Sequence, residues 1–180
     1  MTTIVALLRG INVGGKHSLP MKELRELLRE LGCGEVKTYI QSGNAVFNTS
    51  ADPGVLSQDI TAAIERQFGL APSVLLLTID EYRSILAQNP FPEATSEPKS
   101  IHIGFVTGEP SAPDLAAIDD LQSATENYQL LNGAFWLHAP DGIGRSKLAA
   151  KIDKCLGVAT TGRNWRSAKA IEDLAATIIS

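Results

Sequence analysis

The sequence predicts an α+β fold built from two tandem ferredoxin-like units, each with the element order β-α-β-β-α-β. Two observations lead to this fold class. Short apolar runs, typical of strands, alternate with segments whose apolar residues recur at the spacing of an amphipathic helix. The same order of elements then occurs twice within 180 residues. In such a unit two helices cover one face of an antiparallel sheet, and we expect one further helix at the C-terminal end.

The first unit is expected over residues 1–79. Its predicted helices occupy 21–31 and 56–68, where apolar residues recur at helical spacing, and Pro20 suits the start of the first helix. Four short runs predict the strands, at 3–9, 35–40, 45–48 and 73–78. The turn Gln41-Ser42-Gly43-Asn44 joins the two middle strands.

Residues 80–99 are expected to hold a helix near 80–88 and a proline-rich linker, and the second unit is expected over 100–180. This unit repeats the topology of the first without clear residue-level identity. Asn132-Gly133 marks the turn of a predicted hairpin over 128–138. The other predicted elements are a strand at 101–106, a helix near 113–121, a helix carrying Leu148, Ile152, Cys155 and Leu156, a strand at 158–161 and a last helix carrying Ile171, Leu174, Ala175 and Ile178.

The composition is that of a soluble globular protein. Hydrophobic residues make up 44% of the chain. No apolar run approaches the roughly 20 residues that span a bilayer, and the N-terminal residues lack the pattern of a signal peptide. We therefore expect a cytoplasmic protein without membrane contact.

The cysteines and histidines do not indicate a metal centre. Cys33 and Cys155 are far apart in sequence, and the three histidines show no zinc-binding spacing. We expect no metal and no cofactor, and the cysteines are interpreted as buried thiols of a reducing compartment.

Charge is unevenly distributed along the chain. The net charge is -4, but residues 141–170 contain seven basic and two acidic side chains. An acidic protein with one basic segment is not typical of a general nucleic-acid coat, yet the segment can hold an anion. A solvated helix face is the alternative interpretation.

A first polar cluster is predicted where the loop after the first strand lies beside the turn between the second and third strands. Gly10, Gly15 and Lys16 match the spacing G-x-x-x-x-G-K, but His17 replaces the Ser or Thr that a true P-loop needs for magnesium. The glycines either present N–H groups to an anion or only shape the loop. The candidate ligand-binding residues are Arg9, Asn12, Gly14, Gly15, Lys16, Gln41, Ser42 and Asn44, of which the turn residues either contact a ligand or only cap backbone groups.

A second, basic cluster is predicted at one end of the second sheet, where two strands run into helix N-termini. Such positions favour anions, because N–H groups and the helix dipole point outward there. Trp165 either packs the last helix onto the sheet or stacks on a base. The candidate residues are Arg145, Ser146, Lys147, Arg163, Asn164, Trp165 and Arg166.

Three stretches carry a family resemblance: ALLRGINVGGKHSLPMKELRELL, TYIQSGNAVF and GIGRSKLAAKIDKCLGVATTGRNW. Together they resemble a bacterial family, the domain of unknown function numbered 1697. The resemblance brings no established reaction, substrate or cofactor. The chain departs from the family pattern at His17, Arg166 and Ser167. The positions that the resemblance singles out are Arg9, Gly10, Asn12, Gly14, Gly15, Gln41, Ser42, Gly43, Asn44, Gly144, Arg145, Ser146, Arg163, Asn164 and Trp165.

Three classes of function stay open. The favoured one is binding of an anionic ligand, either a nucleotide or a phosphorylated metabolite. An enzyme acting on a phosphorylated small molecule is the second, although no nucleophile-base pair can be recognised. A regulatory or interaction module is the third. RNA recognition by an aromatic sheet is disfavoured, because the two central strands of the first unit offer only Phe47. The sequence does not decide the oligomeric state or whether the protein is an enzyme.

Overall fold

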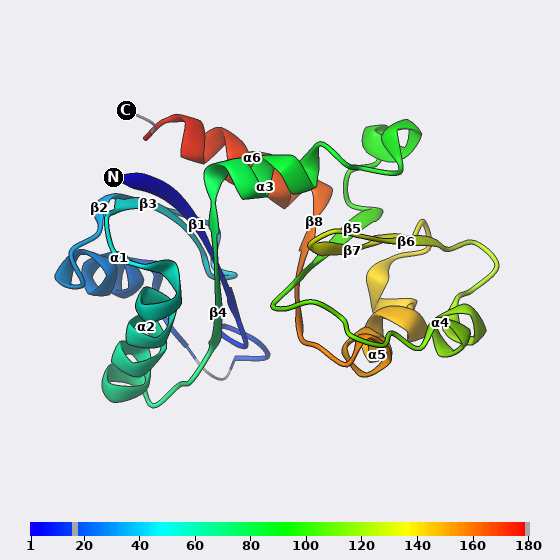
Figure 1. Ribbon diagram of the computed structural model, residues 1–180, viewed down its shortest axis with the longest axis horizontal. Helices are drawn as coiled ribbons and strands as arrows, with labels where there is room; N and C mark the ends of the chain where they lie inside the picture. Colours follow the sequence, from blue (N-terminus) through cyan, green and yellow to red (C-terminus); the bar gives the residue numbers. More distant parts are fainter. Residues whose placement is uncertain (16–17, 179–180) are drawn as a thin grey trace. The chain divides into compact units, whose positions relative to one another are not determined.

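The computed structural model describes residues 1–15 and 18–178. The described residues form two four-stranded antiparallel sheets with helices (Figure 1). The first sheet has the order β2-β3-β1-β4, which is the order of a ferredoxin-like unit. Its elements are β1 (Thr2–Arg9), α1 (Met21–Glu30), β2 (Gly34–Tyr39), β3 (Asn44–Thr49), α2 (Pro53–Phe68) and β4 (Ser73–Thr78).

The second sheet repeats this topology with the order β6-β7-β5-β8, which confirms the predicted fold class. Short 3₁₀ turns occur at Pro92–Ser96 and Ile143–Arg145. The α-helices and strands from residue 79 onward are α3 (Ile79–Leu86), β5 (Ile101–Val106), α4 (Leu115–Leu121), β6 (Asn127–Leu131), β7 (Ala134–His138), α5 (Lys147–Leu156), β8 (Thr160–Asn164) and the C-terminal α6 (Trp165–Ala176).

Two compact units divide the chain. One contains Met1–Arg83 together with the residues from Ala170 onward, and the other contains Ser84–Lys169. The predicted boundaries at 79 and 100 stay predictions. The compact units follow a different division, because the residues from Ala170 onward, which include the end of α6, belong to the first unit.

The first unit buries both faces of its sheet. On one face, Ile4, Ala6 and Leu8 of β1 share a hydrophobic core with α1 and α2. On the other face, the Nδ2 of Asn48 donates to the carbonyl oxygen of Ile178 at 3.0 Å. The residues that follow α6 therefore add a contact on the second face of the sheet to the predicted arrangement.

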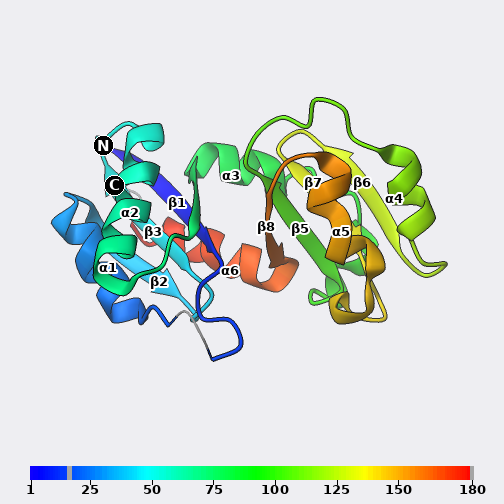
Figure 2. The same ribbon diagram turned by 90° about the horizontal axis from the view of Figure 1, so that it is seen from below.

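The second unit packs α4 and α5 on one face of its sheet (Figure 2). Phe135 and Leu137 of β7 share this core with Leu148 and Leu156 of α5, while Trp136 is buried on the opposite face. The alternation of inward and outward side chains along β7 is the period of two expected of a strand.

The position of β8 corrects one prediction. The strand was expected at 158–161, but it occupies Thr160–Asn164, so that Arg163 and Asn164 lie within it. Gly157 ends α5 in a left-handed conformation with φ of 70°. The Oδ1 of Asp153 then accepts from the backbone N–H of Thr160 at 3.0 Å. Val158 therefore lies in the reversal of the chain, and the carbonyl of Ala159 accepts from the backbone N–H of Thr107 at 3.2 Å directly before the strand begins.

In the described ranges, every helix is too short or too polar to cross a bilayer.

Candidate functional site

The loop after β1 is fastened to the β2–β3 turn by the side chain of Asn12. Its Nδ2 donates to the carbonyl oxygens of Leu19, at 2.9 Å, and of Gln41, at 2.7 Å. Its Oδ1 accepts from the backbone N–H of Leu19 at 2.7 Å. The two segments therefore meet as the topology predicts, and the Asn12 amide is used to hold them together.

The β2–β3 turn also uses predicted site residues for its own structure. Asn44 is only 1% exposed, and its Nδ2 donates to the carbonyl of Tyr39 and to the Oγ of Ser42. For Asn44, these contacts supply the backbone capping that was one of the two open interpretations. Gln41 and Ser42 are exposed and stay candidates for ligand contact.

Arg9, Gly14 and Gly15 are exposed in the first unit. Arg9 ends β1 opposite Ser73 of β4. Gly14 and Gly15 have φ of 61° and 72°, the left-handed region that favours glycine. Lys16 lies outside the described residues together with His17, so its predicted role stays a prediction.

The second cluster lies at the predicted end of the second sheet. β7 and β8 both run antiparallel to β5, so they point the same way. Lys147 begins α5 and Trp165 begins α6. Two helix N-termini thus follow strands that end on the same side of the second sheet.

Several residues of this second cluster have structural contacts. The Oγ of Ser146 accepts from the backbone N–H of Ala149, and the Oδ1 of Asn164 accepts from that of Ser167, so both cap helices. The Trp165 ring lies 6.0 Å from that of Trp136, centroid to centroid, and Lys169 Nζ lies 5.9 Å from the Trp165 ring. Trp165 thus makes the packing contact that was one of its two interpretations.

A pocket of about 190 Å³ opens at the N-terminus of α5. Arg145 and Ser146 are the two predicted residues that line it, whereas Lys147, Arg163, Asn164, Trp165 and Arg166 do not. The remaining lining residues are Ser123, Glu126, Ala139, Asp141 and Gly142. The pocket therefore gathers only part of the predicted basic cluster.

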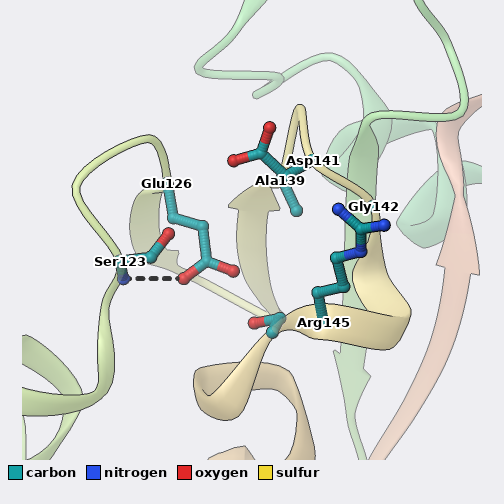
Figure 3. A pocket seen from close by; sticks show the side chains of 7 residues that line it. Ser123, Glu126, Ala139, Asp141, Gly142 and Arg145 are labelled. Atoms are coloured by element: carbon teal, nitrogen blue, oxygen red, sulfur yellow. Dashed lines mark hydrogen bonds between the residues drawn. The ribbon is translucent and has the colours of Figure 1, made fainter.

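Both signs of charge face this pocket (Figure 3). Glu126 is 6% exposed, and its Oε2 accepts from the backbone N–H of Ser123 at 2.9 Å. The Oδ2 of Asp141 accepts from the hydroxyl of Thr125 at 2.6 Å, which ties the loop before β6 to the loop after β7. The guanidinium of Arg145 makes no hydrogen bond or ion pair with any residue that the structure describes.

Glu126 was not among the predicted site residues, because a carboxylate in a loop is ordinarily solvated. The available signal was the spacing Ser123-x-x-Glu126, which is typical of a capping box but here precedes a strand. A carboxylate accepting from the N–H three residues earlier is a local feature. The burial of Glu126 is not signalled locally, because the pocket that it lines also takes residues from the loop after β7.

Perturbed pKa values occur at buried or hydrogen-bonded groups away from the pocket. Burial raises the pKa of the Cys33 thiol to about 11, so this thiol is protonated at neutral pH and is a poor nucleophile. Burial lowers the pKa of His102. A hydrogen bond to Asp119 raises the pKa of the Tyr128 hydroxyl to about 12. None of these three groups lines the pocket.

Fold and site together define a class: an α+β protein of two ferredoxin-like units with a small charged pocket in the second. The family described as "Protein of unknown function (DUF1697)" matches residues 1–136, and the chain belongs to this family. The resemblance seen in the sequence is thereby confirmed. The matched residues end within β7, before Asp141, Arg145 and Ser146 of the pocket.

A solved structure shares this fold along almost the whole chain. The conserved bacterial protein SP0830 from Streptococcus pneumoniae is 24% identical, with a TM-score of 0.74 over 97% of this chain and 98% of its own. At this identity the similarity concerns the fold alone. Among curated proteins, none matches the chain.

Proposed function

We propose that the protein binds a small anionic ligand, a phosphorylated metabolite or the phosphate-bearing part of a nucleotide, in the pocket beside α5. One observation carries the proposal. The Arg145 guanidinium lines an open pocket and is not engaged by any described side chain. A guanidinium with its donors available binds a phosphate through two parallel hydrogen bonds.

The start of α5 supports an anion at the same place. The Oγ of Ser146 satisfies the N–H of Ala149, while the N–H groups of the residues between them have no partner within the helix. The helix dipole favours a negative charge here by about 0.3–1 kcal/mol. This contribution is smaller than the roughly 1.5–3 kcal/mol of a hydrogen bond to a charged group, so Arg145 is expected to dominate the affinity.

The volume of the pocket limits the size of the ligand. Pockets for drug-sized ligands and cofactors span roughly 300–1,000 Å³. At about 190 Å³, this pocket fits a sugar phosphate, or one end of a nucleotide, rather than a complete dinucleotide.

Arg145→Ala is expected to weaken binding of ribose 5-phosphate by about 10- to 100-fold, because one charge-assisted contact is lost. Isothermal titration calorimetry at low ionic strength measures the change. Lys147→Ala is the matched control, since Lys147 is an exposed cation two positions further along that does not line the pocket. Equal effects of the two substitutions, or none for Arg145→Ala, would contradict the proposal.

Purified protein is expected to show no magnesium-dependent hydrolysis of ATP. A P-loop follows a strand of a parallel sheet, whereas β1 is antiparallel to both of its neighbours, β3 and β4. The residue after Lys16 is His17, which lacks the hydroxyl that holds magnesium. A phosphate-release assay on the wild type and on His17→Ser tests this, and turnover by either protein above background would refute it.

We also propose a cytoplasmic location. Cys33 and Cys155 are free and buried, which is compatible with a reducing compartment. Fractionation of cells producing the tagged chain checks the location.

A further inference from the structure

The carboxylate of Glu126 is buried but has few hydrogen-bond partners, which is unusual for a residue with a structural role alone. It is buried to more than nine-tenths, and its Oε2 has one donor, the N–H of Ser123. In the described part of the chain its Oε1 has no hydrogen-bond partner, and neither oxygen forms an ion pair. Figure 3 shows this carboxylate turned toward the space between Ser123 and Arg145.

A buried charge without a full set of partners costs free energy. Glutamine would accept the same hydrogen bond from Ser123 through its amide oxygen and would avoid burying a charge. The carboxylate is thus better than glutamine only if its second oxygen also receives a proton donor. No described residue supplies that donor, and Oε1 is not among the fully buried atoms without a partner, so the donor comes from the pocket, where a ligand group takes the place of water.

Asp141 adds a second carboxylate, and so further hydrogen-bond acceptors, to the wall of the pocket. Its Oδ2 holds the hydroxyl of Thr125, and its side chain also lines the cavity. Glu126 and Asp141 contribute two negative charges against the one positive charge of Arg145. A simple dianion such as inorganic phosphate meets repulsion from two carboxylates here, whereas a ligand with a donor group at its other end turns one or both into partners.

We infer that the pocket selects bipolar ligands, which carry a hydrogen-bond donor beside their anionic group, and that Glu126 is the specificity-determining residue that accepts from this donor. The inference rests on the proposed anion site at Arg145. The donor is a hydroxyl, as in a sugar phosphate, or an ammonium, as in an aminoalkyl phosphate. Either group donates a hydrogen bond, and a charged carboxylate accepts such a bond more strongly than the neutral amide of glutamine does.

The test compares three probes: ribose 5-phosphate, phosphoethanolamine and inorganic phosphate, titrated against the wild type and Glu126→Gln. We expect at least one of the two donor-bearing probes to bind the wild type about 10-fold or more tightly than inorganic phosphate. Which of them does so distinguishes a hydroxyl from an ammonium. Glu126→Gln should weaken the binding of the preferred probe. Because the substitution removes a negative charge, it should strengthen the binding of inorganic phosphate.

Opposite signs of these two effects separate specificity from folding, because a merely structural role would move both affinities in the same direction. Glu109→Gln is the matched control, since it removes one exposed carboxylate of the same unit outside the pocket. Arg145-dependent binding of all three probes with equal affinity, unchanged in Glu126→Gln, would overturn the inference and leave the proposed function standing. Failure of every probe to bind would overturn both.

Discussion

Replacing Gly43 with alanine is expected to lower the free energy of unfolding by about 2–5 kcal/mol, a large part of the stability of a domain. Two costs combine. Gly43 has φ of 79°, a conformation that costs other residues roughly 1–2 kcal/mol. A Cβ atom would also lie 2.7 Å from the Leu8 Cβ and 2.8 Å from the Ile11 Cδ1, and overpacking of this kind costs about 1–3 kcal/mol.

Gly14→Ala is the matched control for this prediction. Gly14 has a similar φ of 61°, but an added Cβ would meet nothing within 4 Å. This variant therefore carries only the backbone cost, about 1–2 kcal/mol. Urea denaturation measures both values. Equal losses in the two variants would show that the turn moves away from β1 and that the close contact is not required.

The contact at Gly43 explains how the β2–β3 turn is held at the end of the sheet. The backbone N–H of Leu8 donates to the Gly43 carbonyl at 2.8 Å, so the turn continues the pairing of β1 with β3 beyond Asn44. The hydrogen bond itself is of ordinary length, but only a residue without a side chain fits here, because an added Cβ would lie 2.7 Å from the Leu8 Cβ. The sequence signals a turn here, but it does not signal that this glycine packs against Leu8 and Ile11.

Local patterns were sufficient to predict the fold. Helical spacing, strand-length apolar runs and the Asn132-Gly133 turn each report on a few neighbouring residues, and the topology follows from their order. β8 was misplaced because Val158 has strand propensity but lies in the reversal after Gly157, and the strand begins only at Thr160. Tertiary contacts of Asp153 with Thr160 override that propensity.

The candidate site was predictable only in part. Arg145 and Ser146 stand out because they precede a helix, which is a local property. Glu126 is buried and lines the pocket together with a loop that follows a different strand, and nothing in its immediate sequence indicates this placement. The seven basic residues of 141–170 suggested one anion patch, whereas the pocket combines one of them with two carboxylates.

Asn12→Ala is expected to lower the free energy of unfolding by about 2–4 kcal/mol, the second large effect. The alanine variant loses all the side-chain hydrogen bonds of Asn12, including both contacts with Leu19, whose side chain is fully buried. Backbone groups left without partners in such a place cost roughly 1–3 kcal/mol. Asn12 also has φ of 54°, which asparagine tolerates better than alanine.

Two further substitutions divide these costs. Asn12→Gly loses the same hydrogen bonds but relieves the backbone, so it should be more stable than Asn12→Ala by about 1 kcal/mol. Asn12→Asp keeps an acceptor for the Leu19 N–H and loses the donations to Leu19 and Gln41, so it should also be destabilised. Urea denaturation of all three variants, beside titration with ribose 5-phosphate, gives the comparison. If Asn12→Ala were as stable as the wild type but bound the probe more weakly, Asn12 would be a ligand-binding residue of the first unit. A loss of stability with unchanged affinity instead assigns Asn12 to holding the loop closed, and leaves the pocket beside α5 as the place where the ligand binds.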